Sequence, residues 1–162
     1  MDIITTIRQR RSVRKFKKKQ IEEDKLNTVL DAARLAPSSM NSQPWEFIVI
    51  KDPTTLKEIA KEAAYGKFIP DAPVVVAFVV DPSKSHLHEV DGALATQNFM
   101  LAAWALGLGT CWIGTMNRER VKELLGISKH KDLLTVIPIG YIDTIGDSSR
   151  KPLKSLVRYE RK

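Results

Sequence analysis

The side chains best suited to chemistry in this sequence lie in two short stretches, and the first is Arg10-Arg11-Ser12-Val13-Arg14. Arg10, Ser12 and Arg14 occupy alternate positions, and in an extended chain alternate side chains point to one side. Arginine donates hydrogen bonds in a fixed fork that matches the oxygens of a phosphate. The spacing therefore suits a phosphorylated ligand, although exposed basic residues after a helix end would give the same pattern without one.

The second stretch is Pro37-Ser38-Ser39-Met40-Asn41-Ser42-Gln43-Pro44-Trp45. It concentrates hydroxyl and amide side chains between two prolines that stiffen the backbone. Because serine, asparagine and proline also favour turns, a plain surface turn is the alternative interpretation. Met40 and the adjacent Trp45 are more apolar than a plain turn requires, which favours a binding loop.

The positive charge of the chain is concentrated at its two ends. The net charge is +7, and residues 1–19 hold eight Lys and Arg against Asp2, while residues 148–162 hold six against Glu160. The body between them is therefore acidic. Either both ends converge on one anion, or they are solvated tails without a partner. A nucleic-acid-binding protein usually carries a basic face on its folded body, so nucleic-acid binding ranks last. The run Lys15–Lys19 has no assigned role.

The length of 162 residues predicts one domain, residues 1–162, and 43% hydrophobic residues suit a soluble globular protein. The apolar run 73–80 is only strand-sized, so no membrane span is expected. The beginning of the chain lacks the features of a signal peptide. Cys111 is the only cysteine, which excludes a disulfide framework and favours a cytoplasmic location.

One polar cluster resembles a set of metal ligands: His86, His88, Glu89 and Asp91. Its spacing matches no established metal-binding pattern. We interpret it as a polar loop that leads into a helix, and we expect no metal site. Cys111 is expected to be a small buried residue rather than a reactive thiol.

Apolar periodicity predicts the elements that position these groups. Expected strands cover residues 45–50, 73–80 and 134–142, with a short one near 156–159. Pro138 predicts an irregularity or an edge position in the third of these. Expected helices follow Asp2, start near 22–24 and end near Ala36, and cover 54–64, 91–106 and 118–125.

The expected helix 91–106 is apolar on nearly all sides, so it must be enclosed by protein, which favours a dimer interface. Gly107 and Gly109 are expected to end it, and the basic side chains of helix 118–125 are expected to be solvated. Two helices precede the first strand and the alternation is irregular. This pattern favours a mixed sheet wrapped by helices over a doubly wound fold.

Four motifs, in this order, resemble the nitroreductase family, and the resemblance runs from Ile7 to Leu156. They are the Arg-Ser-Arg stretch, the Pro-Ser-Ser-x-Asn-x-Gln-Pro-Trp loop before a Phe-Ile-Val strand, Gln97-Asn98 in an Ala-rich helix, and Gly107-Leu108-Gly109-Thr110-Cys111-Trp112-Ile113-Gly114. The resemblance implies an α+β fold with a central mixed, mainly antiparallel sheet wrapped by helices. It also implies interlocked homodimers that bind FMN between the subunits.

Carried over position by position, the resemblance implies two sets of FMN-binding residues. One subunit would contribute Arg10, Arg11, Ser12 and Arg14, and Ile113, Gly114 and Arg150 would bind the same flavin. The other would contribute Pro37, Ser38, Ser39, Met40 and Asn41, with Gln43 in the same loop. Arg14 would lie near the pyrimidine edge of the flavin, the Gly114 N–H near its N5 atom, and Arg150 near the phosphate. No catalytic side chain is assigned, because the flavin carries the chemistry.

The resemblance implies hydride transfer from NADH or NADPH through FMN to a nitro compound, quinone or similar planar acceptor. Two departures from the family pattern are Ser148, where some members have lysine, and Ile113, where others have an acidic residue. The segments that often cover the flavin are also short. The alternative is therefore a flavin enzyme of the same fold with a dedicated substrate, such as a dehydrogenase, dehalogenase or flavin-handling enzyme.

Overall fold

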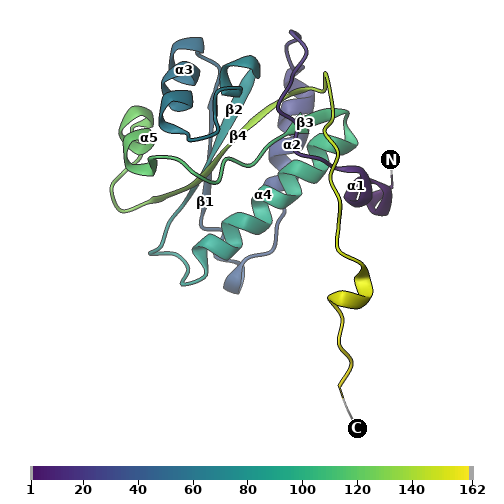
Figure 1. Ribbon diagram of the computed structural model, residues 1–162. Helices are drawn as coiled ribbons and strands as arrows, with labels where there is room; N and C mark the ends of the chain where they lie inside the picture. Colours follow the sequence, from purple (N-terminus) through teal and green to yellow (C-terminus); the bar gives the residue numbers. More distant parts are fainter. Residues whose placement is uncertain (1, 161–162) are drawn as a thin grey trace.

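The structure is a computed structural model that describes residues 2–160 of the chain (Figure 1). Arg161 and Lys162, two cations of the basic C-terminal end, lie outside the described residues. The helices are α1 (Ile3–Gln9), α2 (Glu23–Arg34), α3 (Pro53–Glu62), α4 (His88–Ala105) and α5 (Arg118–Leu125), with short 3₁₀ turns η1 (Ser39–Asn41), η2 (Ile69–Asp71) and η3 (Leu153–Ser155). The strands are β1 (Trp45–Ile50), β2 (Val74–Val80), β3 (Leu108–Thr110) and β4 (Asp132–Tyr141).

Capping residues explain where several of the helices begin and end. The Asp2 carboxylate accepts a hydrogen bond from the Thr5 N–H at 3.0 Å, and that of Asp52 accepts one from the Thr55 N–H at 2.7 Å. These contacts satisfy backbone donors that a helix start leaves free. At the other end of α5, Gly126 adopts a left-handed conformation with φ of +65°. The helices predicted from the sequence are confirmed to within a few residues.

The four strands form one sheet in the order β1-β2-β4-β3, and every neighbouring pair is antiparallel. Within the described residues, the parallel pairing is an isolated bridge between Ser12 and Thr110, at the outer edge of β3. The predicted α+β class with a mainly antiparallel sheet is confirmed. The outer edge of β1 pairs with no strand in the described part of the chain.

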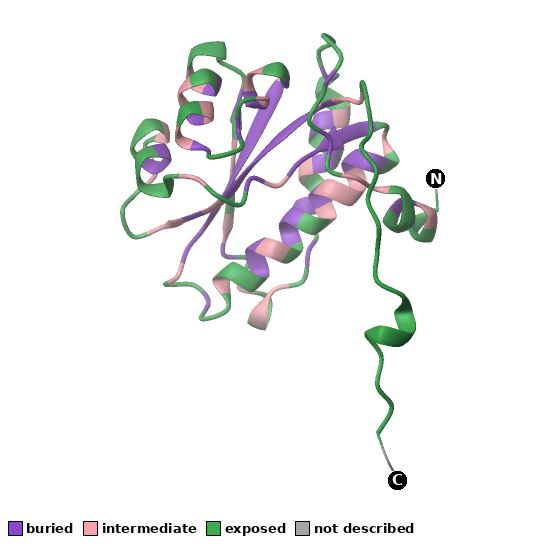
Figure 2. Cartoon of the chain, viewed as in Figure 1, coloured by how far each residue is buried: buried purple, intermediate pink, exposed green. Residues whose placement is uncertain are grey.

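Helices cover both faces of this sheet, which explains why all seven residues of β2 are buried (Figure 2). Alternate side chains of a strand point to opposite faces. Val74, Val76 and Phe78 pack with α2 and α4, whereas Val75, Ala77 and Val79 pack with α3 and α5. The sheet is therefore the middle of three layers, and β2 and β4 are its rigid centre.

Helix α4 is only partly enclosed by its own chain. Phe99 and Ala103 are buried against the sheet, but Val90 is 54% exposed and Leu94 41%. The neighbouring helix α1 exposes three isoleucines in the same way: Ile3, Ile4 and Ile7. The sequence predicts that α4 is enclosed by protein. Within its own chain, however, α4 and the neighbouring α1 leave an exposed apolar surface.

One of the two alternatives predicted from Pro138 is wrong, because β4 lies between β2 and β3 and not at an edge. The other alternative, an irregularity, is present in β4. Its ladder with β2 shifts register between Phe78 and Val79, and its ladder with β3 ends at the pair Thr110–Ile139, next to Pro138, which has no N–H to donate. The short strand expected near 156–159 does not form, since residues 151–160 extend away from the body with no strand to pair with (Figure 1).

Two smaller expectations also change. Gly107, with φ of +77°, follows α4, but Gly109 lies within β3, where a Cβ atom would come 2.6 Å from the Val13 side chain. The face of α5 is not wholly solvated, because the Lys122 side chain is only 7% exposed and pairs with Glu119. None of the described helices combines the length and apolar character needed to cross a membrane.

Candidate functional site

The stretch Arg10–Arg14 is held against the sheet by its backbone. The Val13 N–H donates to the Thr110 carbonyl at 2.9 Å, and the Val13 side chain is fully buried. Because Gly109 has no Cβ, Val13 packs directly on β3. Arg10, Ser12 and Arg14 therefore face away from the core, as the alternating pattern predicted.

These residues and the C-terminal end line one cavity of about 270 Å³, which we call the cation pocket. Its lining consists of Arg10, Arg11, Ser12, Arg14, Gly146, Asp147, Ser148 and Arg150. The two basic ends of the chain thus converge, and the interpretation that both were solvated tails is wrong for Arg10–Arg14 and Arg150. Asp147 is the one carboxylate among the lining residues.

The electrostatics of the cation pocket favour an anion. Partial burial lowers the pKa of Arg10, and the nearby guanidinium groups of Arg150 and Arg11 lower it further. Removing guanidinium groups from water and placing them together is unfavourable without a counter-charge. Inorganic or organic phosphate would supply that charge and accept the hydrogen bonds that these groups donate.

The arginines differ in the hydrogen bonds they already make. One nitrogen of Arg11 donates to the carbonyls of Arg8 and Arg10, at 2.8 and 3.0 Å, so it holds the end of α1. Arg150 contacts the hydroxyl of Ser148 and donates to the Ser149 carbonyl at 2.8 Å. Arg10 and Arg14 have no recorded side-chain partner among the described residues.

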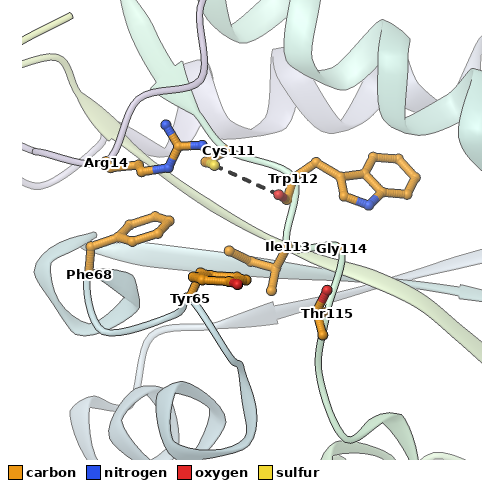
Figure 3. Close-up of a pocket in the computed structure, with 8 residues that line it drawn as sticks. All are labelled: Arg14, Tyr65, Phe68, Cys111, Trp112, Ile113, Gly114 and Thr115. Atoms are coloured by element: carbon orange, nitrogen blue, oxygen red, sulfur yellow. Dashed lines mark hydrogen bonds between the residues drawn. The ribbon is translucent and has the colours of Figure 1, made fainter. Parts of the chain in front are cut away.

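Arg14 also lines a second cavity of about 180 Å³, which we call the ring pocket (Figure 3). Its other walls are Tyr65, Phe68, Cys111, Trp112, Ile113, Gly114 and Thr115. Figure 3 shows the Tyr65 and Phe68 rings on the side opposite to the strand-like backbone of residues 111–114. Since Arg14 belongs to both pockets, a ligand with a phosphate in the first could place a planar group in the second.

The backbone at Gly114 is accessible to a ligand. Gly114 is exposed, and a Cβ atom there would meet no atom within 4 Å. No acceptor for the Gly114 N–H is recorded among the described residues. Ile113, in contrast, is buried. The segment therefore offers one free backbone donor and an unobstructed face beside a fixed apolar side chain.

The second stretch forms an exposed loop with an unusual backbone. Met40, Asn41 and Gln43 all have positive φ angles, of 51°, 55° and 46°, and Met40 is 99% exposed. Left-handed conformations of residues other than glycine are strained and cluster at functional sites. The loop is held from below by Asp91, whose carboxylate accepts the Ser39 N–H at 2.9 Å and the Ser85 hydroxyl at 2.6 Å.

The loop does not reach either pocket in its own chain. It is fixed to Asp91 near the start of α4, whereas Ser12 pairs with Thr110, which follows the end of that helix. About 20 Å of helix separates these points. Figure 1 accordingly shows the loop at the base of the molecule, away from β3. Gln43 lines a shallow hollow with Trp45 and Phe47.

Sequence reasoning missed several residues of the site. Tyr65 and Phe68 follow α3 in a segment that carries no motif, although an exposed aromatic residue after a helix is a usable signal. The sequence pattern places Asp91 in a polar segment before a helix and gives no sign that it holds the loop after Pro37. In the described part of the chain, no three His, Cys, Asp or Glu side chains gather closely enough to hold a metal ion.

Cys111 lines the ring pocket and is 3% exposed. Burial raises the pKa of its thiol, and this effect outweighs the opposing influence of Arg14, Ser12 and Arg10. The Sγ atom lies 3.7 Å from the Trp112 carbonyl oxygen. The expectation of a small buried residue is confirmed.

Comparison with known proteins gives a consistent result. The model of the nitroreductase family matches residues 7–65 and 60–141. A candidate NADH dehydrogenase/NAD(P)H nitroreductase of Methanothermobacter thermautotrophicus is 35% identical over 87% of this chain and 78% of its own length. Human iodotyrosine deiodinase 1 is 26% identical over 93% of this chain and 66% of its own.

Solved structures show the same architecture. An FMN-dependent nitroreductase from Clostridium difficile superposes with a TM-score of 0.91 at 29% identity, over 98% of this chain and 99% of its own. A candidate nitroreductase from Desulfovibrio desulfuricans, solved in complex with FMN, gives a TM-score of 0.92 at 29% identity, over 99% and 98%. The fold predicted from the sequence is therefore confirmed.

Proposed function

This chain belongs to the nitroreductase family, and from that membership we propose that the two pockets together bind FMN. The chain is an FMN-dependent oxidoreductase that transfers a hydride from NADH or NADPH to a planar acceptor such as a nitro compound or quinone. The observation that carries the binding proposal is that Arg14 lines both pockets, one cationic and one with a free backbone donor.

The residues present fit the cofactor. Arg10, Ser12 and Arg150 would bind the phosphate, which would balance guanidinium groups that are already partly removed from water. Arg14 would lie at the pyrimidine edge of the ring. Ile113 would support one face of the ring, and the free N–H of Gly114 would donate toward N5.

The flavin, when bound, accepts a hydride and passes it on. The protein supplies position and charge. The Arg14 guanidinium would stabilise negative charge at the pyrimidine edge, and the Tyr65 and Phe68 rings would lie along one side of the bound ring. No side chain is assigned as a general acid: Cys111 is buried with a raised pKa, and solvent would supply protons.

Two subunits would complete the site. The loop residues Pro37, Ser38, Ser39, Met40, Asn41 and Gln43 lie far from the cation pocket of their own chain, so they would contribute to the partner's FMN. The exposed apolar side chains of α1 and α4 support such a homodimer: Ile3, Ile4, Ile7, Val90 and Leu94. Burying them would provide the driving force for association.

The C-terminal segment supports the same arrangement. Residues 151–160 extend from the body and expose large apolar side chains, among them Leu153 and Leu156. The outer edge of β1 has no strand beside it within the described residues. The segment near 156–159 would gain the strand predicted from its sequence by pairing with that edge in the partner subunit. The reduced, buried Cys111 supports a cytoplasmic location.

The purified protein provides the first test. It should be yellow, with the flavin absorbance near about 450 nm, and should release FMN on denaturation. Colourless protein that takes up no added FMN would contradict the proposal. Anaerobic mixing with NADH and NADPH in parallel, followed by a screen of nitro compounds and quinones, would identify the donor and the class of acceptor.

A second candidate is a flavin enzyme with a dedicated substrate and little general turnover of NADH or NADPH. The similarity to iodotyrosine deiodinase 1 favours it, as does the short segment over the ring pocket. Under anaerobic conditions this enzyme would keep its oxidised flavin spectrum after NADH or NADPH is added. Prompt bleaching would support the general oxidoreductase instead.

A further inference from the structure

We propose that Thr135 is a positioning residue that tunes the bound flavin through the peptide group between Ile113 and Gly114. Thr135 lies in β4, is fully buried and does not line the ring pocket. Its proposed effect passes through the Gly114 N–H. This inference rests on the proposed function, because it requires FMN in the ring pocket.

The contact that carries the inference is a buried hydrogen bond. The Thr135 hydroxyl lies 3.0 Å from the Ile113 carbonyl oxygen, with the Val136 carbonyl as a second acceptor at 3.2 Å. The Ile113 carbonyl and the Gly114 N–H belong to one peptide group, which is planar. A hydroxyl bound to the oxygen of that group therefore fixes the direction in which its N–H points.

The fold explains why a side chain takes this role. The β3–β4 ladder ends at the pair Thr110–Ile139. Beyond that point, the only backbone–backbone hydrogen bond between residues 111–114 and β4 within the described chain is a long one, 3.4 Å from the Ile113 N–H to the Val136 carbonyl. The β2–β4 pairing also shifts register between Phe78 and Val79. Such irregularities re-aim side chains beside functional sites, and here Thr135 replaces the missing ladder contact.

A second contact fixes the other side of Gly114. The Arg118 guanidinium donates to the Gly114 carbonyl at 3.1 Å and to the Leu133 carbonyl at 3.1 Å. Both peptide groups that flank the Gly114 Cα are thus held from β4 and α5. Glycine would otherwise be the most flexible residue of the ring pocket, so these contacts keep its N–H in one orientation.

The expected direction of the effect follows from hydrogen-bond chemistry. A hydrogen bond to a peptide oxygen polarises the group and strengthens its N–H as a donor. The N5 atom of an oxidised flavin can accept this N–H, but after hydride transfer N5 carries its own hydrogen. The Thr135 contact therefore favours the oxidised flavin. Its loss should weaken the binding of oxidised FMN more than that of reduced FMN.

The experiment compares Thr135→Val with Thr135→Ser, which keeps the hydroxyl, and with Thr96→Val. Thr96 is a matched control, because it is also fully buried and donates to a backbone carbonyl, that of Gly92 at 2.8 Å, within α4. For each variant, FMN affinity is measured in the oxidised and the dithionite-reduced state, and the midpoint potential is measured by dye equilibration. Thermal unfolding of the apo-proteins gives the structural cost.

In Thr135→Val we expect the ratio of oxidised to reduced affinity to fall about three- to tenfold, which corresponds to a rise of about 15–30 mV in midpoint potential for a two-electron couple. Thr135→Ser should keep an affinity ratio and midpoint potential close to those of the wild type, and Thr96→Val should change neither. An equal loss of both affinities, or equal shifts in the two valine variants, would overturn the inference while leaving the function intact. A wild-type protein that binds no FMN would overturn both.

Discussion

The two stretches expected to bind one cofactor are built in opposite ways. Arg10–Arg14 is placed by the core: Val13 is fully buried, and its N–H extends the sheet through Thr110. The loop after Pro37 has a strained backbone and exposes Met40 almost fully. It is held by one carboxylate, that of Asp91. The first stretch is a fixed platform, and the second is a projection with no target in its own chain.

This difference indicates which stretch depends on a partner. Left-handed residues other than glycine cost about 1–2 kcal/mol each, and the loop has three of them. Such strain persists only where the surroundings enforce it, and it is typical of ligand-binding segments. The platform meets its ligand within the chain, whereas the loop acquires a function only when a second subunit brings it to the cation pocket.

The largest effect is expected from Arg10→Ala. This change removes a partly desolvated guanidinium from the cation pocket, and a charge-assisted hydrogen bond contributes about 1.5–3 kcal/mol. FMN affinity should fall about ten- to a hundredfold, as measured by titration of the apo-protein with FMN fluorescence as the signal.

Lys18→Ala is the matched control, because it removes a cation of the same basic segment that lies outside the cation pocket. It should leave FMN affinity unchanged. If Arg10→Ala keeps full affinity, the phosphate is bound elsewhere. If the two variants weaken binding equally, the segment acts only through its overall charge.

Mixing two defective chains tests whether platform and loop meet between subunits. One chain carries Arg10→Ala, and the other carries Ser39→Ala with Asn41→Ala. In a mixed dimer, one site receives both defects and the other receives none. After unfolding and refolding together, about half of the dimers are mixed, so roughly a quarter of the sites should bind FMN with native affinity. No recovery would show that both stretches act within one chain.

Much of the fold could be predicted because local chemistry determined it. Apolar periodicity predicted the helix over 54–64, which Asp52 caps, and the continuous apolar run 73–80 predicted the central strand β2. The place of β4 could not be predicted from Pro138, because the short β3 pairs with β4 only as far as Ile139. That pairing depends on how far a distant segment extends, which the residues around Pro138 do not encode.

The residues of the site also include some that could be predicted from the sequence and some that could not. The residues Arg10–Arg14 of the cation pocket could be predicted because they carry charge and stand at alternate positions. The uneven charge distribution allowed the two ends to converge, and the family resemblance singled out Arg150. Tyr65 and Phe68 could not be predicted, since only the chain path after α3 brings them opposite Gly114. Thr135 was equally hidden, because a buried threonine in a strand is ordinary until its acceptor is known.

A smaller effect is expected from weakening the support of the loop with Asp91→Asn. The asparagine oxygen can accept only one of the two donors that Asp91 now satisfies, Ser39 and Ser85. Leaving a buried donor unpaired costs about 1–3 kcal/mol, which urea unfolding should show. Proteolysis should cut the loop faster, and FMN affinity should fall less than in Arg10→Ala.

Asp31→Asn is the control for this change, because its salt bridge with Arg34 lies on the surface of α2. Exposed pairs contribute about 0–1 kcal/mol, so unfolding should barely change and the loop should resist proteolysis as before. If Asp91→Asn alters unfolding but neither proteolysis nor FMN affinity, Asp91 stabilises α4 and does not position the loop.

The smallest expected effect is a difference in thiol reactivity between Cys111, which directly follows β3, and an exposed position in the loop. Burial raises the pKa of Cys111, so less of it is thiolate at a given pH, and its alkylation curve should lie at higher pH than that of an exposed thiol. Met40→Cys in a Cys111→Ser chain supplies that exposed thiol. At pH 8 the wild-type thiol should react with iodoacetamide at least about threefold more slowly. Equal rates would mean that the segment at Cys111 opens freely and that its burial does not protect the thiol.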